Sequence, residues 1–503
     1  MPTKTIPLFG SFTNRGDITK DQQFFNCFPK VHSNTISGKT RVDLYKRVGV
    51  ASLSETTSNN TTSFGCCVWL GKADGSTPGV LSFVTSAGTA TEIWRPDGAS
   101  SASQIGSDIA TTDACLFLVD TSVSGVSNIT GVFRDSTSLL KEAWFFPEGG
   151  AWTQITDGDF PPNQGTPLPI TPYIAHLDGY MFVMCDNGQI WNSDINSLAN
   201  WTSTSFITAN EFPDGGSGIA RYKDYIVGFG SASIQFFYNA GNATGSPLSP
   251  VANSTINIGA VRVSGKVAPT IREIGNTVYW IGRDATTAKL GVYRFNGLQA
   301  EKVSNQTVDQ FLNPDDAVIT GICGGFSLGG LQHVMFYSGS SVAYNICYCI
   351  DNNFWWTIKL ALQSSSIKGI ASTIRLSEVE TIFNQYTNAD DIYRFRTDGT
   401  TADHTTEPSM IVRTQGLDFD TDEHKFVSEI WLDADTQASG TATLECSDDD
   451  YASWTTLGTF DMTSHEKRIT RCGSHTGERA YRLTHSSDTA FRGRALRIKY
   501  STP

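Results

Sequence analysis

The chain has 503 residues, of which 39% are hydrophobic, 17% charged and 11% aromatic, a composition that supplies a core and excludes disordered and fibrous classes. Its 50 acidic residues outnumber 37 basic ones, for a net charge of −13, so general binding to a phosphate backbone is disfavoured. No apolar run reaches the ~18 residues of a membrane-spanning helix, and the first residues lack the apolar core of a signal peptide. We therefore expect neither membrane insertion nor secretion.

Residues 1–50 precede the regular part of the pattern. They contain Pro7, Pro29 and the turn-like Ser37-Gly38-Lys39, with few apolar runs. Proline and glycine at this density favour extended and turn conformations over a packed element. We expect an extended N-terminal arm that leads into the first regular unit.

Residues 51–400 consist of short apolar and aromatic runs separated by turn signals. One example is residues 173–191, where Asp178-Gly179 and Asn187-Gly188 separate three such runs. These dipeptides readily adopt the positive φ that two-residue hairpin turns require. The pattern predicts an antiparallel meander.

The same meander recurs about every 50 residues. Its repeats cover residues 67–94, 115–155, 173–191, 219–238, 271–303, 334–358 and 370–395. A four-stranded meander per 40–50 residues is typical of a β-propeller. We predict an all-β fold with a propeller of about six to seven four-stranded blades. Two β-sandwiches would show similar turn spacing, but the similar length and order of the units favour the propeller.

Residues 401–503 begin with a polar linker and then depart from the repeat. Strand signals occur at residues 426–432, 442–446, 480–483 and 495–500, which indicate a separate C-terminal β-sandwich. The predicted domains are therefore the arm at 1–50, the propeller at 51–400 and the sandwich at 401–503.

Charge is segregated within this last region. Residues 413–450 carry eleven acidic and two basic side chains, and residues 465–500 carry nine basic and three acidic ones. The two halves either pair across the surface of one sandwich, where exposed pairs contribute little, or dock between neighbouring subunits of a ring. The candidate residues for a subunit or partner interface are Asp448, Asp449, Asp450, Arg492, Arg494, Arg497 and Lys499.

No catalytic constellation is recognisable in the sequence. It has no Gly-x-Ser-x-Gly elbow, phosphate loop or His-Glu-x-x-His, and its eight histidines are scattered. The ten cysteines lie in apolar runs, as buried, reduced thiols do. We expect a protein that is not an enzyme and that uses no cofactor or metal.

One segment resembles a motif of glycan-active propellers. Ser447 to Trp454 is similar to the Asp-box Ser-x-Asp-x-Gly-x-Thr-Trp, with Tyr451 in place of glycine and Ser453 in place of threonine. The carboxylate of such a box caps the amides of a hairpin turn, so the motif favours a fold device over a site. A divalent cation at Asp448, Asp449 and Asp450 is disfavoured because adjacent residues rarely converge on one point.

Several segments resemble a known family. They include Ile6-Pro7-Leu8, Asp21-Gln22-Gln23-Phe24-Phe25-Asn26-Cys27-Phe28-Pro29-Lys30, Lys46-Arg47-Val48-Gly49, Tyr225-Ile226-Val227-Gly228-Phe229-Gly230 and Val278-Tyr279-Trp280-Ile281-Gly282-Arg283-Asp284. With residues 178–201, they resemble the packaged-DNA stabilisation proteins of short-tailed bacteriophages, also called tail hubs or nozzles. The resemblance covers residues 5–310 well and the remainder loosely.

This resemblance implies a structural virion protein of the phage tail, assembled in the bacterial host cytoplasm. It implies a homohexameric ring below the portal and head-to-tail adaptor that retains the packaged DNA until ejection and anchors a tail needle or plug and tailspikes or tail fibres. Double-stranded DNA would pass through the lumen without specific binding, since carboxylates repel phosphates. Two alternatives remain: a glycan-binding or glycan-cleaving, sialidase-like propeller, and a monomeric scaffold for one small partner.

Overall fold

The computed structural model describes most of the chain. The described residues are 2–8, 22–33, 40–56, 60–69, 79–86, 90–96, 103–109, 115–123, 125–134, 141–209, 214–262, 269–312, 321–337, 344–361, 367–375, 378–385, 391–403 and 406–502. Almost all regular structure within them is β-strand; the short helix α1 (Gln306–Phe311) is capped by the Asn305 side chain, which accepts a hydrogen bond from the Val308 amide. No helix in these ranges has the length and apolarity of a membrane span.

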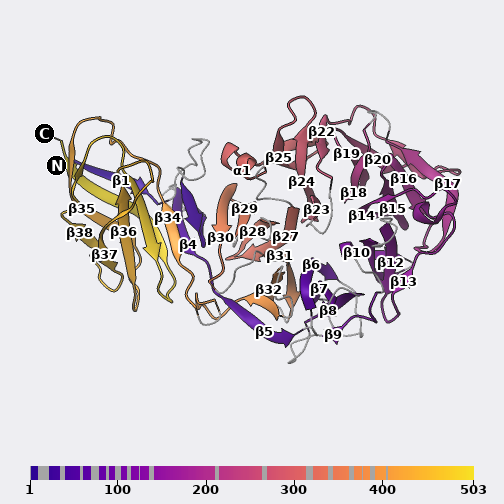
Figure 1. The fold of residues 1–503 in the computed structure, drawn as a ribbon, viewed down its shortest axis with the longest axis horizontal. Coiled ribbons are helices and arrows are strands. Elements are labelled where there is room, and N and C mark those ends of the chain that lie inside the picture. Colours follow the sequence, from indigo (N-terminus) through magenta and orange to yellow (C-terminus); the bar gives the residue numbers. More distant parts are fainter. Residues whose placement is uncertain are drawn as a thin grey trace.

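Seven antiparallel meanders follow one another in the described part of the chain (Figure 1). The first three are β6(Asn60–Trp69)–β7(Gly79–Ser86)–β8(Ala90–Arg95)–β9(Ser103–Gln104), β10(Cys115–Val123)–β11(Val126–Arg134)–β12(Lys141–Pro147)–β13(Thr153–Gln154) and β14(Ile170–Leu177)–β15(Tyr180–Cys185)–β16(Gln189–Ser193)–β17(Trp201–Thr208). The next two are β18(Gly216–Tyr222)–β19(Tyr225–Gly230)–β20(Ile234–Asn239)–β21(Leu248–Pro250) and a sheet of β22(Ile258–Ala260), β23(Ile271–Ile274), β24(Thr277–Asp284), β25(Leu290–Asn296) and β26(Gln299–Lys302). The last two are β27(Gly321–Leu328)–β28(Leu331–Tyr337)–β29(Asn345–Cys349)–β30(Phe354–Ile358) and β31(Ile367–Arg375)–β32(Glu378–Gln385)–β33(Asp391–Phe395)–β5(Val50–Thr56).

The innermost strands of these sheets form a closed ring. In ring order, β6, β10, β14, β18, β23, β27 and β31 each contact the next, and β31 contacts β6 (Figure 1). The predicted all-β propeller is therefore confirmed. The predicted blade description needs one correction: only five of the described sheets are separate four-stranded blades, because one sheet gains a fifth strand and another continues into the C-terminal region.

The ring is closed by strands from both ends of the propeller sequence. β5 is the outer strand of the last blade, where Val50 lies opposite Phe395 and Ala51 opposite Arg394. Pairing β5 with β33 removes a free sheet edge and joins the two ends of the repeat.

The hairpin turns follow the sequence signals. Asp178 and Gly179, which connect β14 and β15, have φ values of 51° and 83°, as a two-residue hairpin turn requires. The predicted meander over residues 173–191 is thus formed with its expected turn chemistry.

The innermost strands share an irregularity near the axis. The pairing of β6, β10, β14, β18, β27 and β31 with the second strand of the blade shifts register, and in the fifth sheet the inner strand is split into β22 and β23. Glycine permits the tight packing there: a Cβ on Gly218 would lie 2.7 Å from the Tyr173 ring, and one on Gly324 would lie 2.0 Å from the Ile370 carbonyl oxygen. Bulges of this kind re-aim side chains, here toward the axis.

The C-terminal region is a sandwich of two sheets. One contains β1(Thr3–Pro7), β3(Cys27–Ser33), β4(Thr40–Lys46), β41(Arg492–Ser501), β35(Lys425–Ala434), β38(Arg468–Thr470) and β39(Ser474–His475). The other contains β2(Gln23–Phe25), β34(Met410–Arg413), β40(Ala480–His485), β36(Thr441–Ser447) and β37(Thr455–Asp461). The residues assigned above to an extended arm thus supply four strands, three of them on the same sheet as β41.

Blade six and the sandwich share one sheet. β2 pairs in parallel with β30, where Phe25 lies opposite Thr357, and antiparallel with β34. One nine-stranded sheet therefore runs from β27 to β37. The buried core is also continuous, since Phe326 of blade six, Phe383 of blade seven and Leu444 of the sandwich belong to one apolar cluster.

A buried ion pair connects the two regions. Arg47 follows β4 and is fully buried, and its Nη2 lies 2.5 Å from the Asp403 carboxylate. Arg47 also donates to the Asn26 side chain and the Lys359 carbonyl, and Asp403 accepts from the Ala361 amide. Removing one member of such a pair leaves a buried charge uncompensated.

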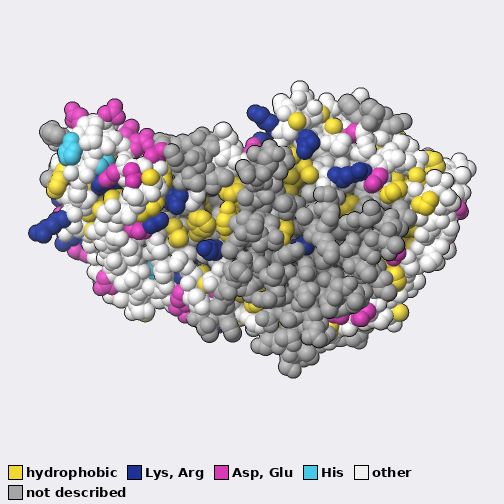
Figure 2. Space-filling model, viewed as in Figure 1, with side chains coloured by type: hydrophobic (Ala, Val, Ile, Leu, Met, Phe, Trp, Pro, Cys, Tyr) yellow, Lys and Arg dark blue, Asp and Glu magenta, His cyan; other side chains and the backbone are white. Residues whose placement is uncertain are grey.

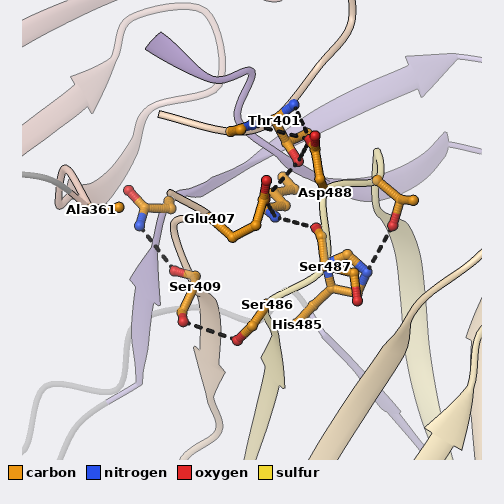
Figure 3. A network of polar contacts seen from close by, with 12 residues as sticks. Ala361, Thr401, Glu407, Ser409, His485, Ser486, Ser487 and Asp488 are labelled. Carbon is orange, nitrogen blue, oxygen red and sulfur yellow. Dashed lines mark hydrogen bonds and ion pairs between the residues drawn. The ribbon is translucent and has the colours of Figure 1, made fainter. Parts of the chain in front are cut away.

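A second polar network lies beside it (Figure 3). The ammonium group of Lys46 donates to the Ser487 carbonyl at 2.8 Å and lies 3.6 Å from the Glu407 carboxylate, while Asp488 accepts from the Thr401 amide. Burial lowers the pKa of Lys46 and raises that of Glu407, and the hydrogen bonds from Thr401 lower the pKa of Asp488. The network ties the linker after the propeller to the end of β40.

The first prediction concerns the buried ion pair. Arg47→Met should lower the free energy of unfolding by about 3–5 kcal/mol, because it leaves Asp403 buried without its partner. Lys4→Met breaks the exposed Lys4–Asp420 pair and should cost less than about 1 kcal/mol. Urea denaturation of both variants measures this, and equal effects would contradict the assigned role.

The second prediction concerns pH. Burial lowers the pKa of His333, His475 and His485 to about 4. Unfolded histidine titrates near 6.5, so between pH 4 and 6.5 the unfolded chain binds more protons and acid destabilises the fold. The free energy of unfolding should fall as the pH is lowered from about 6.5 to about 4, by roughly 1–3 kcal/mol per buried histidine.

Denaturation at a series of pH values measures this slope. His485→Gln should reduce it, whereas His424→Gln at an exposed position should leave it unchanged. A slope unaffected by His485→Gln would show that this histidine does not carry the acid sensitivity.

Candidate functional site

The seven interface candidates lie at two places in the sandwich. Arg492, Arg494, Arg497 and Lys499 are on β41, and Asp448, Asp449 and Asp450 are in the turn between β36 and β37. The structure therefore does not bring all seven into one cluster, and each group has its own partners.

The basic side chains of β41 face acidic ones on β35. Arg494 donates to Asp433 at 2.9 Å and to Asp435 at 3.0 Å, and Arg497 donates to Asp433 at 2.9 Å. Lys499 lies opposite Glu429 in the strand register, with 3.9 Å between the charged groups. Neighbouring antiparallel strands place such pairs side by side.

Asp43 of β4 lies at the centre of this charged face. Its carboxylate is buried and accepts two hydrogen bonds from Arg41, and Arg494 lies 3.4 Å away. Burial alone would raise the pKa of Asp43, but the Arg41 hydrogen bond and the charges of Arg494 and Arg492 outweigh it, so the pKa is lowered. Arg494 and Arg497 likewise lower the pKa of Asp433 against the effect of burial.

The acidic and basic halves of the region thus pair within one chain. Arg492 forms a further ion pair with Asp435, and Arg482 binds Glu445 through two hydrogen bonds. Charges of both signs are correspondingly interspersed on the visible face of the sandwich (Figure 2). The sequence left open whether the two halves pair within one sandwich or between subunits, and these contacts are of the first kind.

The Asp-box-like segment is a capped hairpin turn. Asp449 accepts hydrogen bonds from the Ser453 amide, the Ser453 hydroxyl and the Ser447 hydroxyl. These bonds lower its pKa to about 2, the Ser453 hydroxyl having the largest effect. Tyr451, at the glycine position, has a φ of 70°. The interpretation of this segment as a structural turn motif is confirmed. The motif lies on the sandwich and not on a blade.

The carboxylate of Asp448 also has a partner within the sandwich. Its carboxylate binds the largely buried Arg479 through two hydrogen bonds of 2.6 and 2.7 Å. Asp450 is exposed at the tip, with a φ of 56°. No group of three His, Cys, Asp or Glu residues placed to hold a metal ion occurs in the described ranges.

Next to this turn lies a cluster that the sequence did not indicate. The guanidinium groups of Arg413 and Arg482 both lie over the indole of Trp454, 5.3 and 4.5 Å from the ring centroid. The three residues are distant in sequence, and strand pairing places Arg413 of β34 opposite Arg482 of β40. Only the pairing register of β34 and β40 brings these three residues together, and the sequence does not show that register.

The innermost strands of the propeller line an axial channel. It has a volume of about 610 Å³ and its walls come from the innermost strands, among them Tyr173, Ala220, Arg272, Gly325 and Ile370. A volume in this range fits a small molecule. It does not admit a double helix, whose major groove alone is about 12 Å wide.

Besides Arg272, three charged or titratable side chains line the channel on neighbouring inner strands. His176 is on β14, Arg221 on β18 and Glu273 on β23. Desolvation lowers the pKa of His176, with a further contribution from Arg221, and raises that of Glu273 against the opposing effect of Arg221. The Nε2 atom of His176 is buried and has no hydrogen-bond partner among the described residues.

Arg272 crosses the channel interior. Its Nη2 donates to the Cys66 carbonyl of β6 at 2.5 Å, although β6 is not a ring neighbour of β23. Tyr173 of β14 reaches across Gly218 to accept hydrogen bonds from the amides of Thr270 and Ile271. The sequence analysis missed these residues because nothing local marks which strand of a meander is innermost.

The cysteines behave as expected from their apolar surroundings. All nine that the structure describes are buried, free thiols. Burial raises the pKa of several, including Cys27, Cys347 and Cys472. Thiols in this state are unreactive packing groups.

The third prediction concerns the charged face. Asp43→Asn should lower the free energy of unfolding at pH 7 by about 1–3 kcal/mol, because the hydrogen bonds from Arg41 lose their charged, buried acceptor. A carboxyl with a lowered pKa stabilises the fold above its ordinary pKa and loses this effect as the pH falls toward the folded value. The variant should therefore differ less from the parent at pH 3 than at pH 7.

Asp420→Asn at an exposed position provides the control, with an expected change below about 1 kcal/mol. Chemical denaturation of both variants at pH 3 and pH 7 measures the difference. If the two substitutions have the same effect at pH 7, Asp43 does not organise the charged face.

Comparison with known proteins bears on the propeller. The model of the family described as Bacteriophage P22 Gp10, beta-propeller, matches residues 153–322, which cover the third to fifth blades. No curated protein matches the chain. Among solved structures, two crystal structures of BBS1N in complex with ARL6DN, soaked with mercury and with lead, match with TM-scores of 0.41 and 0.39.

Both of these structures are 10% identical to the chain, and the alignments cover 70% of it and 98% and 97% of the respective matched chains. Over these three blades the chain is similar to this phage family, which supports a phage stabilisation protein.

Proposed function

We propose that this protein forms the nozzle of a short-tailed phage tail. Six copies would make a ring below the portal and head-to-tail adaptor, which continues the DNA channel, retains the packaged DNA until ejection and anchors the needle and the spikes or fibres. The observation that carries the proposal is the family match over three consecutive blades of a closed propeller.

The dimensions of the axial channel support a lumen between subunits. Since Arg272 crosses the interior of the propeller and the cavity is about 610 Å³, DNA cannot pass along the axis of one subunit. A ring of subunits leaves a wider central passage on the symmetry axis. The net charge of −13 favours passage of DNA without binding, because like charges repel.

The connection between propeller and sandwich supports a mechanical role. One nine-stranded sheet, one continuous core and the buried Arg47–Asp403 pair couple the two regions. A subunit built in this way can transmit force without bending at a linker. A tail component that resists the pressure of packaged DNA needs such stiffness.

The proposed interface lies at an exposed part of the sandwich. Asp450 projects at the tip of the β36–β37 turn, where its side chain is exposed. We place a subunit or partner contact at this tip. The glycan-active alternative loses its main support, because Asp449 caps the turn.

The fourth prediction tests the assembly. Light scattering of the purified protein, alone and with its portal–adaptor complex, should show six copies bound per complex. Asp450→Lys should weaken this assembly, because it reverses a charge at the proposed contact. Asp224→Lys, at an exposed turn of the propeller, should leave it unchanged.

A protein that stays monomeric and ignores the complex would contradict the nozzle proposal. Six bound copies for all three proteins would leave the nozzle in place but contradict the contact at Asp450. The two proposals can therefore fail separately.

A further inference from the structure

The inference concerns the axial channel and does not depend on the proposed tail function. Arg272 is enclosed by the inner strands of the propeller, and one of its amino groups is bonded to the Cys66 carbonyl oxygen. The other groups that act on its charge are the thiols of Cys66, Cys67 and Cys323 and the Tyr173 hydroxyl. Among the described residues, no carboxylate lies within ion-pair distance of this guanidinium.

The charge of Arg272 is permanent. Burial lowers its pKa, but a guanidinium keeps its proton in proteins. Arg272 is partly buried, and a charge withdrawn from water without a counter-charge is costly. Neutral carbonyl and hydroxyl groups offset only part of this cost, so the channel has a strong preference for negative charge.

Glu273 does not supply that counter-charge. Glu273 also lines the channel, but it forms no ion pair with Arg272, and the charge that acts on its carboxylate is that of Arg221. Among the residues that line the channel, the arginines Arg221 and Arg272 stand against the single carboxylate of Glu273. The walls of the channel therefore carry more positive than negative charge, within a protein of net charge −13.

The route to Arg272 offers hydrogen-bond donors. Arg221 and His176 line the same cavity, and the buried Nε2 atom of His176 has no partner among the described residues. Lys223 lines an adjoining pocket of about 270 Å³ with Arg221. Cationic and polar groups therefore extend from one mouth of the channel toward Arg272.

We propose that the axial channel binds a small oxyanion of the carboxylate or phosphate type on the guanidinium group of Arg272. The planar guanidinium presents paired N–H groups that match two oxygens of either anion. The channel volume of about 610 Å³ accommodates an anion of this size. The bound anion would neutralise the buried charge and brace β23 against the strands across the axis.

The fifth prediction tests this site by isothermal titration calorimetry. The intact protein is titrated with sodium phosphate and, separately, sodium acetate, at pH 7.5 and at an ionic strength held constant with sodium chloride. One of the two anions should bind saturably at one site per chain. Arg272→Gln should weaken this binding by at least about tenfold, since it removes hydrogen bonds to a charged group.

Arg283→Gln is the matched control, because Arg283 lies on β24 of the same blade and is exposed. It should bind as the parent does. Phosphate binding without acetate binding would identify a tetrahedral anion, and the reverse a carboxylate. The absence of saturable binding of both anions, or equal binding by Arg272→Gln, would overturn the proposal.

Arg272→Lys covers the case in which the glutamine variant does not fold. It keeps the positive charge but loses the paired donors, so the anion should bind several-fold more weakly than in the parent. Unchanged affinity in this variant would show that Arg272 does not bind the anion and only connects β23 to β6.

Discussion

The buried pair of Arg47 and Asp403 is the contact at which the parts of this molecule meet. Arg47 comes from the N-terminal segment, Asp403 from the segment after the last blade, and both also bind the backbone that follows blade six. Neither charge can be buried alone without a large cost. The three segments must therefore come together for any of them to be stable, which makes the junction cooperative.

This junction explains how the N-terminal arm is held against the rest of the chain. β2 needs β30 and β34 as partners for its backbone, and β3 and β4 form a hairpin that contacts β41 (Figure 1). Pairing satisfies the hydrogen-bonding groups of otherwise free sheet edges. Both termini lie at the far end of the sandwich, away from the propeller (Figure 1), so the chain starts and ends in the same region. The division into 1–50, 51–400 and 401–503 as separate folding units stays a prediction.

The sandwich and the axial channel differ in whether the chain itself supplies counter-charges to their charged side chains. On the sandwich, Asp43 is surrounded by arginines from β4 and β41, and its pKa is lowered because ion pairs outweigh desolvation. In the axial channel, Arg272 forms no ion pair with a described residue and donates to the Cys66 carbonyl oxygen. The charge of Asp43 is balanced within the chain, whereas the charge of Arg272 requires an anion from outside the chain.

The sequence by itself determined the features that depend on local chemistry. Turn dipeptides such as Asp178-Gly179 set the hairpins, the repeat length set the propeller, and the Ser447–Trp454 spacing identified a capped turn. These follow from backbone preferences within a few residues. The tertiary structure alone decided the contacts between distant residues: the strand order that places β2 between two regions, the pairing of Arg494 with Asp433, and the position of Arg272 on an innermost strand. Such contacts depend on ring closure and strand register, and no local pattern encodes which strand will lie beside which.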